Sequence, residues 1–185
     1  SQFDLSADGS TANLKPGEVI SVKDLMYCLL LPSANEAANI LAEAVAATSS
    51  FIELMNQRAR ELGCTGTHFA NTHGLHDDDH YTTAYDICLF TREALKHDLI
   101  REVGATSVTT GPRHQLSEPR DVYNTNALLS NWHYMGYVYD KAIGVKLDTP
   151  EAGRCLVSAA VDGDEYLIAV ILGAEPAVRE DGLHR

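Results

Sequence analysis

The sequence is poor in positive charge and has no long apolar run. Its 185 residues carry 14 lysine and arginine against 26 aspartate and glutamate, a formal net charge of −12 at pH 7. Clustered basic residues hold nucleic acids and anionic membrane surfaces, so we expect no nucleic acid as a partner and no polybasic membrane patch. No stretch approaches the roughly 20 apolar residues of a transmembrane helix, and no signal-peptide pattern opens the sequence.

Cysteines at the close spacing of metal sites or redox motifs are also missing. Cys28, Cys88 and Cys155 sit inside apolar runs, and Cys64 lies far from all three. The pattern therefore favours free, buried thiols that act as small hydrophobic side chains over disulfides.

The composition that remains is that of a globular protein, 45% hydrophobic and 22% charged. This length is enough for one domain with a real core. We predict a single domain over 1–185, mainly helical over about 21–100 and formed by strands over about 140–173.

Hydrophobic periodicity predicts four helices in the first half. The first follows a capping box at Ser21 to Asp24. It ends at Pro32, because the residue before a proline is pushed out of the helical region. The other three are expected over 35–47, 50–63 and 83–95.

The second half is richer in β-forming residues. Residues 107–110 look extended, and 142–146 form a short strand candidate. Two longer β-rich runs, 154–161 and 165–172, flank Asp162-Gly163-Asp164, a strong hairpin signal. Helices followed by antiparallel strands predict an α+β fold. A sheet made of these strands alone would have too little of the chain packed against it to cover its apolar side chains.

Three residues could carry chemistry. Ser33 and Asn35 follow Pro32 at a helix junction, where such residues usually cap the next helix. The alternative is a hydroxyl that relays a proton and an amide that binds substrate. Lys146 ends a predicted strand. A lysine there is ordinarily a solvated surface residue, and the alternative role is a cation that binds a substrate carboxylate. Taken singly, each position favours the ordinary role.

Five longer stretches place these residues in a context. They are 30–38 with Ser33-Ala34-Asn35, 67–75, 80–86, 124–129, and 144–157 with Gly144-Val145-Lys146. In this order they resemble the serine-type D-alanyl-D-alanine carboxypeptidases of the low-molecular-mass penicillin-binding protein family, peptidase family S11. The first is similar to the family's S-x-N element, and the last to its K-T-G strand. The similarity runs from about Gly9 to Gly173, nearly the whole chain.

The resemblance implies a penicillin-binding-protein/β-lactamase-like transpeptidase fold, an antiparallel sheet flanked by helices with a mainly helical region. It implies a serine nucleophile in an S-x-x-K motif, which attacks the penultimate D-alanine carbonyl of a peptidoglycan stem peptide ending in D-Ala-D-Ala. The acyl-enzyme releases terminal D-alanine, and β-lactams acylate the same serine. Carried over, Ser33 is the relay hydroxyl, Asn35 contacts the substrate amide, and Lys146 is the anchor near the substrate carboxylate.

Two departures from the family matter. The sequence contains no S-x-x-K, which in the family lies upstream of Gly9, so we expect an incomplete fold that is inactive as given. At the K-T-G positions, Leu147 removes the hydroxyl expected to hold the substrate carboxylate. Asp148 adds a like charge and a side chain where glycine allows close approach.

These departures keep two other hypotheses open. Leu147 and Asp148 support a non-catalytic cell-wall-binding homologue that keeps the groove. A serine β-lactamase-like hydrolase would share the S-x-N and K-T-G motifs, but the stretch over 73–86 disfavours this hypothesis.

A polar loop with His73, His76 and His80 beside three aspartates offers ligand types for zinc. Its spacing does not match the H-E-x-x-H helical pattern, and aspartate-rich loops are commonly solvated. We therefore expect neither a metal nor a cofactor.

The resemblance also implies a location and a tendency to associate. Peptidoglycan lies outside the cytoplasmic membrane, so the full protein is expected at the extracytoplasmic face of the membrane or in the periplasm. A sheet that lacks its upstream strands is expected to expose an apolar face and so to favour self-association.

Overall fold

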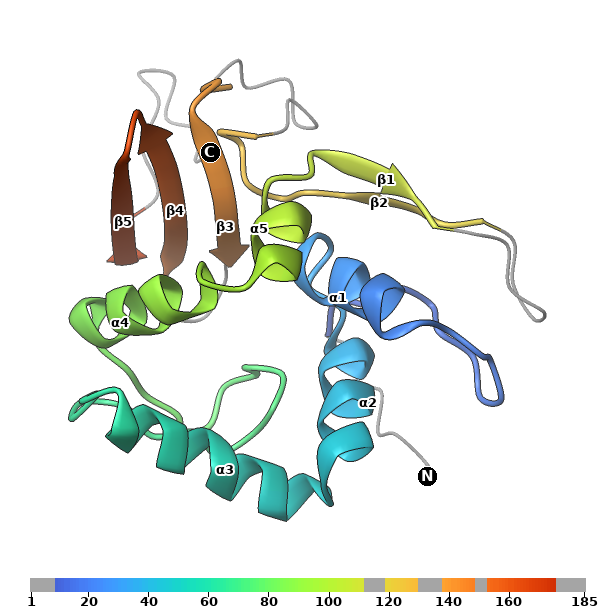
Figure 1. The fold of residues 1–185 in the computed structure, drawn as a ribbon. Coiled ribbons are helices and arrows are strands. Elements are labelled where there is room, and N and C mark those ends of the chain that lie inside the picture. The colour runs from blue at the N-terminus through green and yellow to red at the C-terminus, as the bar shows by residue number, and fades with distance from the viewer. Residues whose placement is uncertain (1–8, 112–118, 130–137, 149–152, 176–185) are drawn as a thin grey trace.

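The computed structural model describes residues 9–111, 119–129, 138–148 and 153–175, with the side chains of 147 and 148 outside this description. Figure 1 shows a sheet at one side of the molecule and helices beneath and beside it, so the predicted α+β class is confirmed. The helices are α1 (Val22–Leu30), α2 (Asn35–Val45), α3 (Thr48–Glu61), α4 (Ala84–Ala94) and α5 (Asp98–Gly104). The strands are β1 (Val108–Thr110), β2 (Asp121–Tyr123), β3 (Ala142–Asp148), β4 (Arg154–Asp162) and β5 (Glu165–Ala174).

Side-chain caps begin two of the helices where the sequence predicted them. The Ser21 hydroxyl accepts a hydrogen bond from the Asp24 backbone N–H at 3.0 Å and starts α1. In the same way the Thr83 hydroxyl accepts from the Asp86 N–H at 3.1 Å and starts α4. Such caps satisfy backbone donors that have no partner within the helix, so both helices begin at positions fixed by local sequence.

The larger sheet has the strand order β3-β4-β5, all antiparallel. β4 and β5 form the predicted hairpin, and its turn contains Gly163 with a positive φ of 62°. A two-residue turn of this kind needs backbone conformations that glycine adopts easily. A second sheet pairs β1 with β2.

The core is centred on α1. Leu31, Val103 and Val122 are buried together where the end of α1 meets α5 and β2. A second cluster joins the other face of α1 to α2 and to the segment before α1: Ala12, Leu25, Cys28, Ala34 and Ala37. Helix α5 also packs on β3 and so lies between α1 and the larger sheet (Figure 1).

Several element boundaries differ from the prediction. Helix α2 ends at Val45 instead of residue 47, and α3 begins two residues early, at Thr48. Helix α5 and strand β2 were not predicted. The seven residues of α5 span only about two turns, and Asp121-Val122-Tyr123 of β2 is a short β-forming run between Pro119 and Asn124. Within the described residues no single helix is long and apolar enough to cross a membrane, although α2 and α3 pass that test as a pair bent by 90°.

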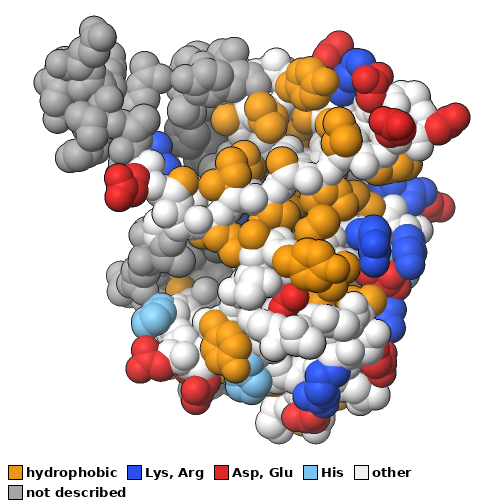
Figure 2. Space-filling view, turned by 90° about the vertical axis from the view of Figure 1, so that its left-hand side faces the viewer, with side chains coloured by type: hydrophobic (Ala, Val, Ile, Leu, Met, Phe, Trp, Pro, Cys, Tyr) orange, Lys and Arg blue, Asp and Glu red, His pale blue; other side chains and the backbone are white. Residues whose placement is uncertain are grey.

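Strand β5 leaves apolar side chains open to solvent. Tyr166, Leu167, Ile171 and Leu172 are all exposed, Leu167 to 60%. Figure 2 views the side where β5 and α4 lie in Figure 1 and shows apolar side chains gathered across this face. Apolar side chains of β5, the edge strand of the described sheet, are therefore exposed to solvent within the described part of the chain.

Candidate active site

A tight turn joins α1 to α2 and carries two of the predicted site residues. Helix α1 ends with Leu31 as its C-cap, and Pro32 follows, as the sequence predicted. The Ala34 N–H donates to the Cys28 carbonyl at 2.9 Å and closes the turn. Ser33 then has a φ of 66°, in the left-handed region. A non-glycine residue seldom adopts this conformation, and residues that do so cluster at functional sites.

Neither polar residue of the turn caps α2, so the ordinary role considered for Ser33 and Asn35 is wrong. The N-cap position belongs to Ala34, which makes no side-chain hydrogen bond, and Asn35 is already the first helical residue. Both side chains are half-buried. Among the described residues neither the Ser33 hydroxyl nor the Asn35 amide has a hydrogen-bond partner, so both groups remain available to a ligand.

A buried carboxylate holds the neighbouring segment against this turn. Glu36, 3% exposed, accepts at Oε1 from the Thr11 hydroxyl and the Ala12 N–H, both at 2.7 Å. The Asn35 N–H donates to the Ser10 carbonyl at 2.9 Å. The segment before α1 is thereby fixed across the start of α2. Glu36 could not be singled out from the sequence, because an acidic residue in the first turn of a helix is common on electrostatic grounds alone.

Lys146 lies on β3, opposite Val157 of β4, and is half-buried. Leu147 pairs with Leu156 and Asp148 with Cys155 in the same register, and their side chains lie outside the described residues. Helix α5 contacts both β3 and α1. The strand of Lys146 is therefore linked through one short helix to the helix that ends at the Ser33 turn.

Close backbone packing sets the distance between α5 and β3. Gly144 has a φ of 136°, and a Cβ there would lie 3.3 Å from the Gly104 carbonyl oxygen. Any larger residue at Gly144 would therefore be strained and would crowd α5. This explains in physical terms why glycine stands two residues before Lys146.

The histidine loop is organised by its own backbone. The Ala70 N–H donates to Nδ1 of His80, and the Leu75 N–H donates to Nδ1 of His73, both at 3.1 Å. Burial lowers the pKa of both histidines. Nowhere in the described residues do three potential ligands come together in a group able to hold a metal ion. The loop is fastened to α2 by the Thr72 hydroxyl, which donates to the Asn39 side chain.

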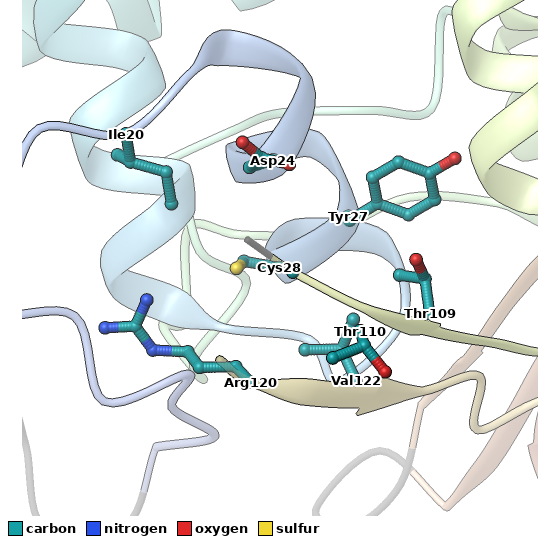
Figure 3. A pocket seen from close by; sticks show the side chains of 9 residues that line it. Ile20, Asp24, Tyr27, Cys28, Thr109, Thr110, Arg120 and Val122 are labelled. Carbon is teal, nitrogen blue, oxygen red and sulfur yellow. The ribbon is translucent and has the colours of Figure 1, made fainter. Parts of the chain in front are cut away.

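A small cavity of about 50 Å³ lies elsewhere, between α1 and the β1–β2 pair (Figure 3). Side chains of α1 face those of the two strands across it. Burial raises the pKa of the Cys28 thiol at its wall to about 11, so this cysteine is a protonated core group and not a nucleophile. All four cysteines are free, as predicted, but only Cys28 and Cys64 are buried, and Cys88 and Cys155 are half-buried. Ser33, Asn35 and Lys146 are not among the residues that line this cavity.

Comparisons with known proteins agree on one family. A family model described as D-alanyl-D-alanine carboxypeptidase matches residues 2–176. The D-alanyl-D-alanine carboxypeptidase DacF of Bacillus subtilis is 34% identical over 180 residues, which cover 94% of this chain and 43% of the relative. DacC of Escherichia coli is 37% identical over 165 residues, 88% of this chain and 38% of the relative.

Solved structures give the same result. The DD-transpeptidase of Streptomyces K15 superposes with a TM-score of 0.79 and 33% identity, over 90% of this chain and 66% of that one. An evolved putative penicillin-binding protein homologue from Mycobacterium tuberculosis superposes with a TM-score of 0.78 and 28% identity, over 98% of this chain and 64% of that one. The chain therefore spans less than two thirds of each of these relatives. It belongs to the D-alanyl-D-alanine carboxypeptidase family, with the penicillin-binding-protein fold that the sequence predicted.

Proposed function

We propose that this chain is part of a serine-type D-alanyl-D-alanine carboxypeptidase that removes the terminal D-alanine from peptidoglycan stem peptides. A serine oxygen attacks the penultimate D-alanine carbonyl, D-alanine leaves with a proton, and water hydrolyses the resulting ester. The relatives named as D-alanyl-D-alanine carboxypeptidases support this reaction class. β-Lactams are expected to acylate the same serine.

The observation that carries the proposal is the Ser33 turn. Its left-handed backbone and unused polar groups cost stability and serve no capping purpose. Such strain persists where the surrounding structure holds a functional geometry. Ser33 relays a proton between the nucleophile and the leaving amine, and Asn35 binds the amide of the stem peptide.

Lys146 is the proposed electrostatic anchor for the substrate carboxylate. The ammonium group of a lysine is a compact positive charge that suits this role. Leu147 and Asp148 weaken it, because the first offers no hydroxyl and the second repels the same carboxylate. We therefore propose that acylation and turnover are slow even with the nucleophile present.

The chain as given is proposed to be inactive. An S-x-x-K motif supplies the nucleophile of this family, and the 185 residues contain none. The full protein acts where peptidoglycan lies, exported to the extracytoplasmic face of the membrane or to the periplasm.

Labelling with a fluorescent penicillin tests this proposal. The full-length natural protein and the present chain are incubated with the probe, separated on a denaturing gel and weighed intact. We expect the longer protein to be labelled and this chain to remain unlabelled. In the longer protein, Ser33→Ala should slow acylation by about a hundredfold, a typical loss for an acid–base group. Labelling of the present chain would contradict the proposal.

A non-catalytic cell-wall-binding homologue is the second candidate, and Leu147 and Asp148 favour it. The double variant Leu147→Thr/Asp148→Gly in the longer protein separates the two hypotheses. An enzyme weakened at these positions should be acylated faster after the change. A binding homologue without a nucleophile should remain unlabelled while still sedimenting with purified peptidoglycan.

We also propose that the present chain self-associates through β5. The strand ends the described sheet, and its ten residues hold one charged side chain and no proline. Charges and prolines are the usual means by which edge strands avoid pairing with other chains. A second copy in antiparallel orientation would pair β5 with itself about a twofold axis.

A further inference from the structure

Strand β3 carries an irregularity close to Lys146. Ala142 pairs with Ala160 and Gly144 with Ala159, so Ile143 is one extra residue in β3. A β-bulge of this kind bends the strand and changes the direction of the side chains that follow. The direction of Lys146, two residues beyond Gly144, therefore depends on how firmly this bulge is held.

A buried hydroxyl of β4 holds the bulge. Ser158, 6% exposed, donates from Oγ to the Gly144 carbonyl at 2.8 Å. The backbone of Ser158 pairs with Val145, the residue between Gly144 and Lys146. One residue of β4 thus contacts the strand by both backbone and side chain at the point where the register shifts.

A buried asparagine orients that hydroxyl. Asn126, fully buried, directs its side-chain NH₂ at Ser158 Oγ across 3.5 Å, and its Oδ1 accepts from the Leu128 N–H at 3.0 Å. An amide NH₂ can only donate, so the Ser158 oxygen accepts from it and its own hydrogen is left for Gly144. The Gly144 carbonyl can only accept, so Ser158 donates to the bulge while it accepts from Asn126.

The network continues to α5, the helix that packs on both β3 and α1. The Asn126 N–H donates to Oδ1 of Asn124 at 2.9 Å. The Asn124 NH₂ donates to the carbonyls of Gly104 at 3.1 Å and Thr106 at 2.9 Å. Gly104 is the last residue of α5 and contacts the bulge at Gly144. The bulge is therefore held from β4 on one side and from α5 on the other.

We propose that Ser158 is a positioning residue that sets the placement of Lys146 by holding the Gly144 carbonyl. This rests on the proposed function of Lys146 as the anchor for the substrate carboxylate. Ser158 acts through β3, which is why motif comparison alone does not single it out.

Three variants of the present chain test the placement. Ser158→Ala removes the hydroxyl, and Ser158→Thr keeps it. Thr91→Val is the matched control, because Thr91 is a buried residue whose hydroxyl also donates to a backbone carbonyl, that of Ile87 at 2.7 Å in α4. If Ser158→Ala does not fold by circular dichroism, Ser158→Cys takes its place, since a thiol is a weaker donor of similar size.

The readout is the ¹³Cε resonance of Lys146 in lysine-labelled protein, assigned by its loss in Lys146→Arg. We expect the resonance to shift in Ser158→Ala and to stay in place in Ser158→Thr and Thr91→Val. Amide exchange in β3 should rise about fivefold in Ser158→Ala alone, the factor of one net hydrogen bond. An unchanged resonance in Ser158→Ala, or an equal shift in Thr91→Val, would overturn the proposal.

A functional measurement separates this proposal from the proposed function. In the full-length natural protein, Ser158→Ala should slow acylation by a penicillin about fivefold, and Ser158→Thr should restore it. If the unaltered full-length protein is not labelled at all, the proposed function fails, and the Lys146 resonance still decides whether Ser158 positions that side chain. Full acylation in Ser158→Ala would overturn the positioning role.

Discussion

Arg120 and Glu18, 102 residues apart in the sequence, form a two-armed ion pair in which each guanidinium nitrogen lies 2.7 Å from a different carboxylate oxygen. The Glu18 side chain is only 2% exposed and that of Arg120 16%. The hydrogen bond to Glu18 raises the pKa of Arg120. Arg120 also donates to the Asn13 carbonyl at 3.2 Å. The pair therefore fastens the segment before α1 to the start of β2.

Arg120→Met should destabilise the chain by about 3 kcal/mol, because it breaks a buried ion pair by removing the guanidinium that binds both carboxylate oxygens of Glu18. Methionine keeps the apolar length of the side chain, so the loss reports the charge. Urea denaturation followed by circular dichroism measures it.

Arg58→Met is the control for this prediction. Arg58 pairs with Glu61 and Glu93 at the surface, where its own side chain is 54% exposed. Exposed ion pairs contribute little to stability, so this variant should unfold close to the parent. If the two arginine variants lose the same stability, the Arg120–Glu18 pair does not hold the segment.

Leu167→Lys should weaken self-association of the present chain. The Leu167 side chain is exposed on β5, the edge strand of the described sheet, and a lysine there places a charge where a second copy would pair. Sedimentation velocity over a range of protein concentrations should show larger species for the parent and a monomer for the variant. Val45→Lys, on the exposed side of α2, introduces the same charge elsewhere and should leave association unchanged. A parent that stays monomeric throughout would argue against β5 as a contact surface.

Local signals were enough to predict the elements whose ends are fixed by short-range hydrogen bonds. The caps at Ser21 and Thr83 and the turn at Gly163 each involve residues within a few positions of one another. Elements fixed by distant partners could not be predicted this way. Strand β2 exists because Val122 is buried against α1 and α5 and its backbone pairs with β1.

The residues of the candidate site fall into the same two groups, those that local sequence predicts and those that depend on distant partners. Ser33, Asn35 and Lys146 could be singled out from short motifs and their resemblance to a family. Glu36 and Ser158 could not, because their partners lie 24 residues away at Ala12 and 14 residues away at Gly144. The role of a buried polar side chain depends on the group it contacts in the folded chain. A local sequence pattern does not predict that contact.

The histidine loop should lose stability as the pH falls below neutrality. Burial is the main cause that lowers the pKa of His73 and His80, so the unfolded chain binds protons more readily than the folded one. Stability is then fully present above the unfolded pKa of about 6.5. It declines as the pH drops from there through the lowered folded values, because protonation also removes the Nδ1 acceptor from the Ala70 and Leu75 N–H groups.

His80→Asn tests this, because the asparagine oxygen can replace Nδ1 as acceptor without titrating. We expect a shallower loss of unfolding free energy between pH 7 and about pH 5 than in the parent. His76→Asn, at an exposed position of the same loop, should keep the parent's decline. An identical slope in His80→Asn and the parent would show that the ring of His80 does not contribute.

Ser33→Gly should stabilise the chain while impairing the proposed function. The left-handed φ of 66° costs a non-glycine residue about 1 kcal/mol, and glycine removes that cost. Part of the gain is lost to the greater freedom of glycine in the unfolded chain, so we expect a net gain of about 0.5 kcal/mol in urea denaturation. Ser33→Ala keeps the strain and should bring no gain.

Asn13→Gly is the matched control, since Asn13 also has a positive φ, 56°, outside the candidate site. Asparagine adopts this region more readily than serine, so its replacement should gain less stability. In the full-length protein Ser33→Gly should lose penicillin acylation and Asn13→Gly should keep it. A strained residue whose relief costs activity is one that the fold holds in place for its chemistry. If Ser33→Gly instead destabilises the chain and leaves acylation intact, the turn is an ordinary connection and Ser33 has no part in the reaction.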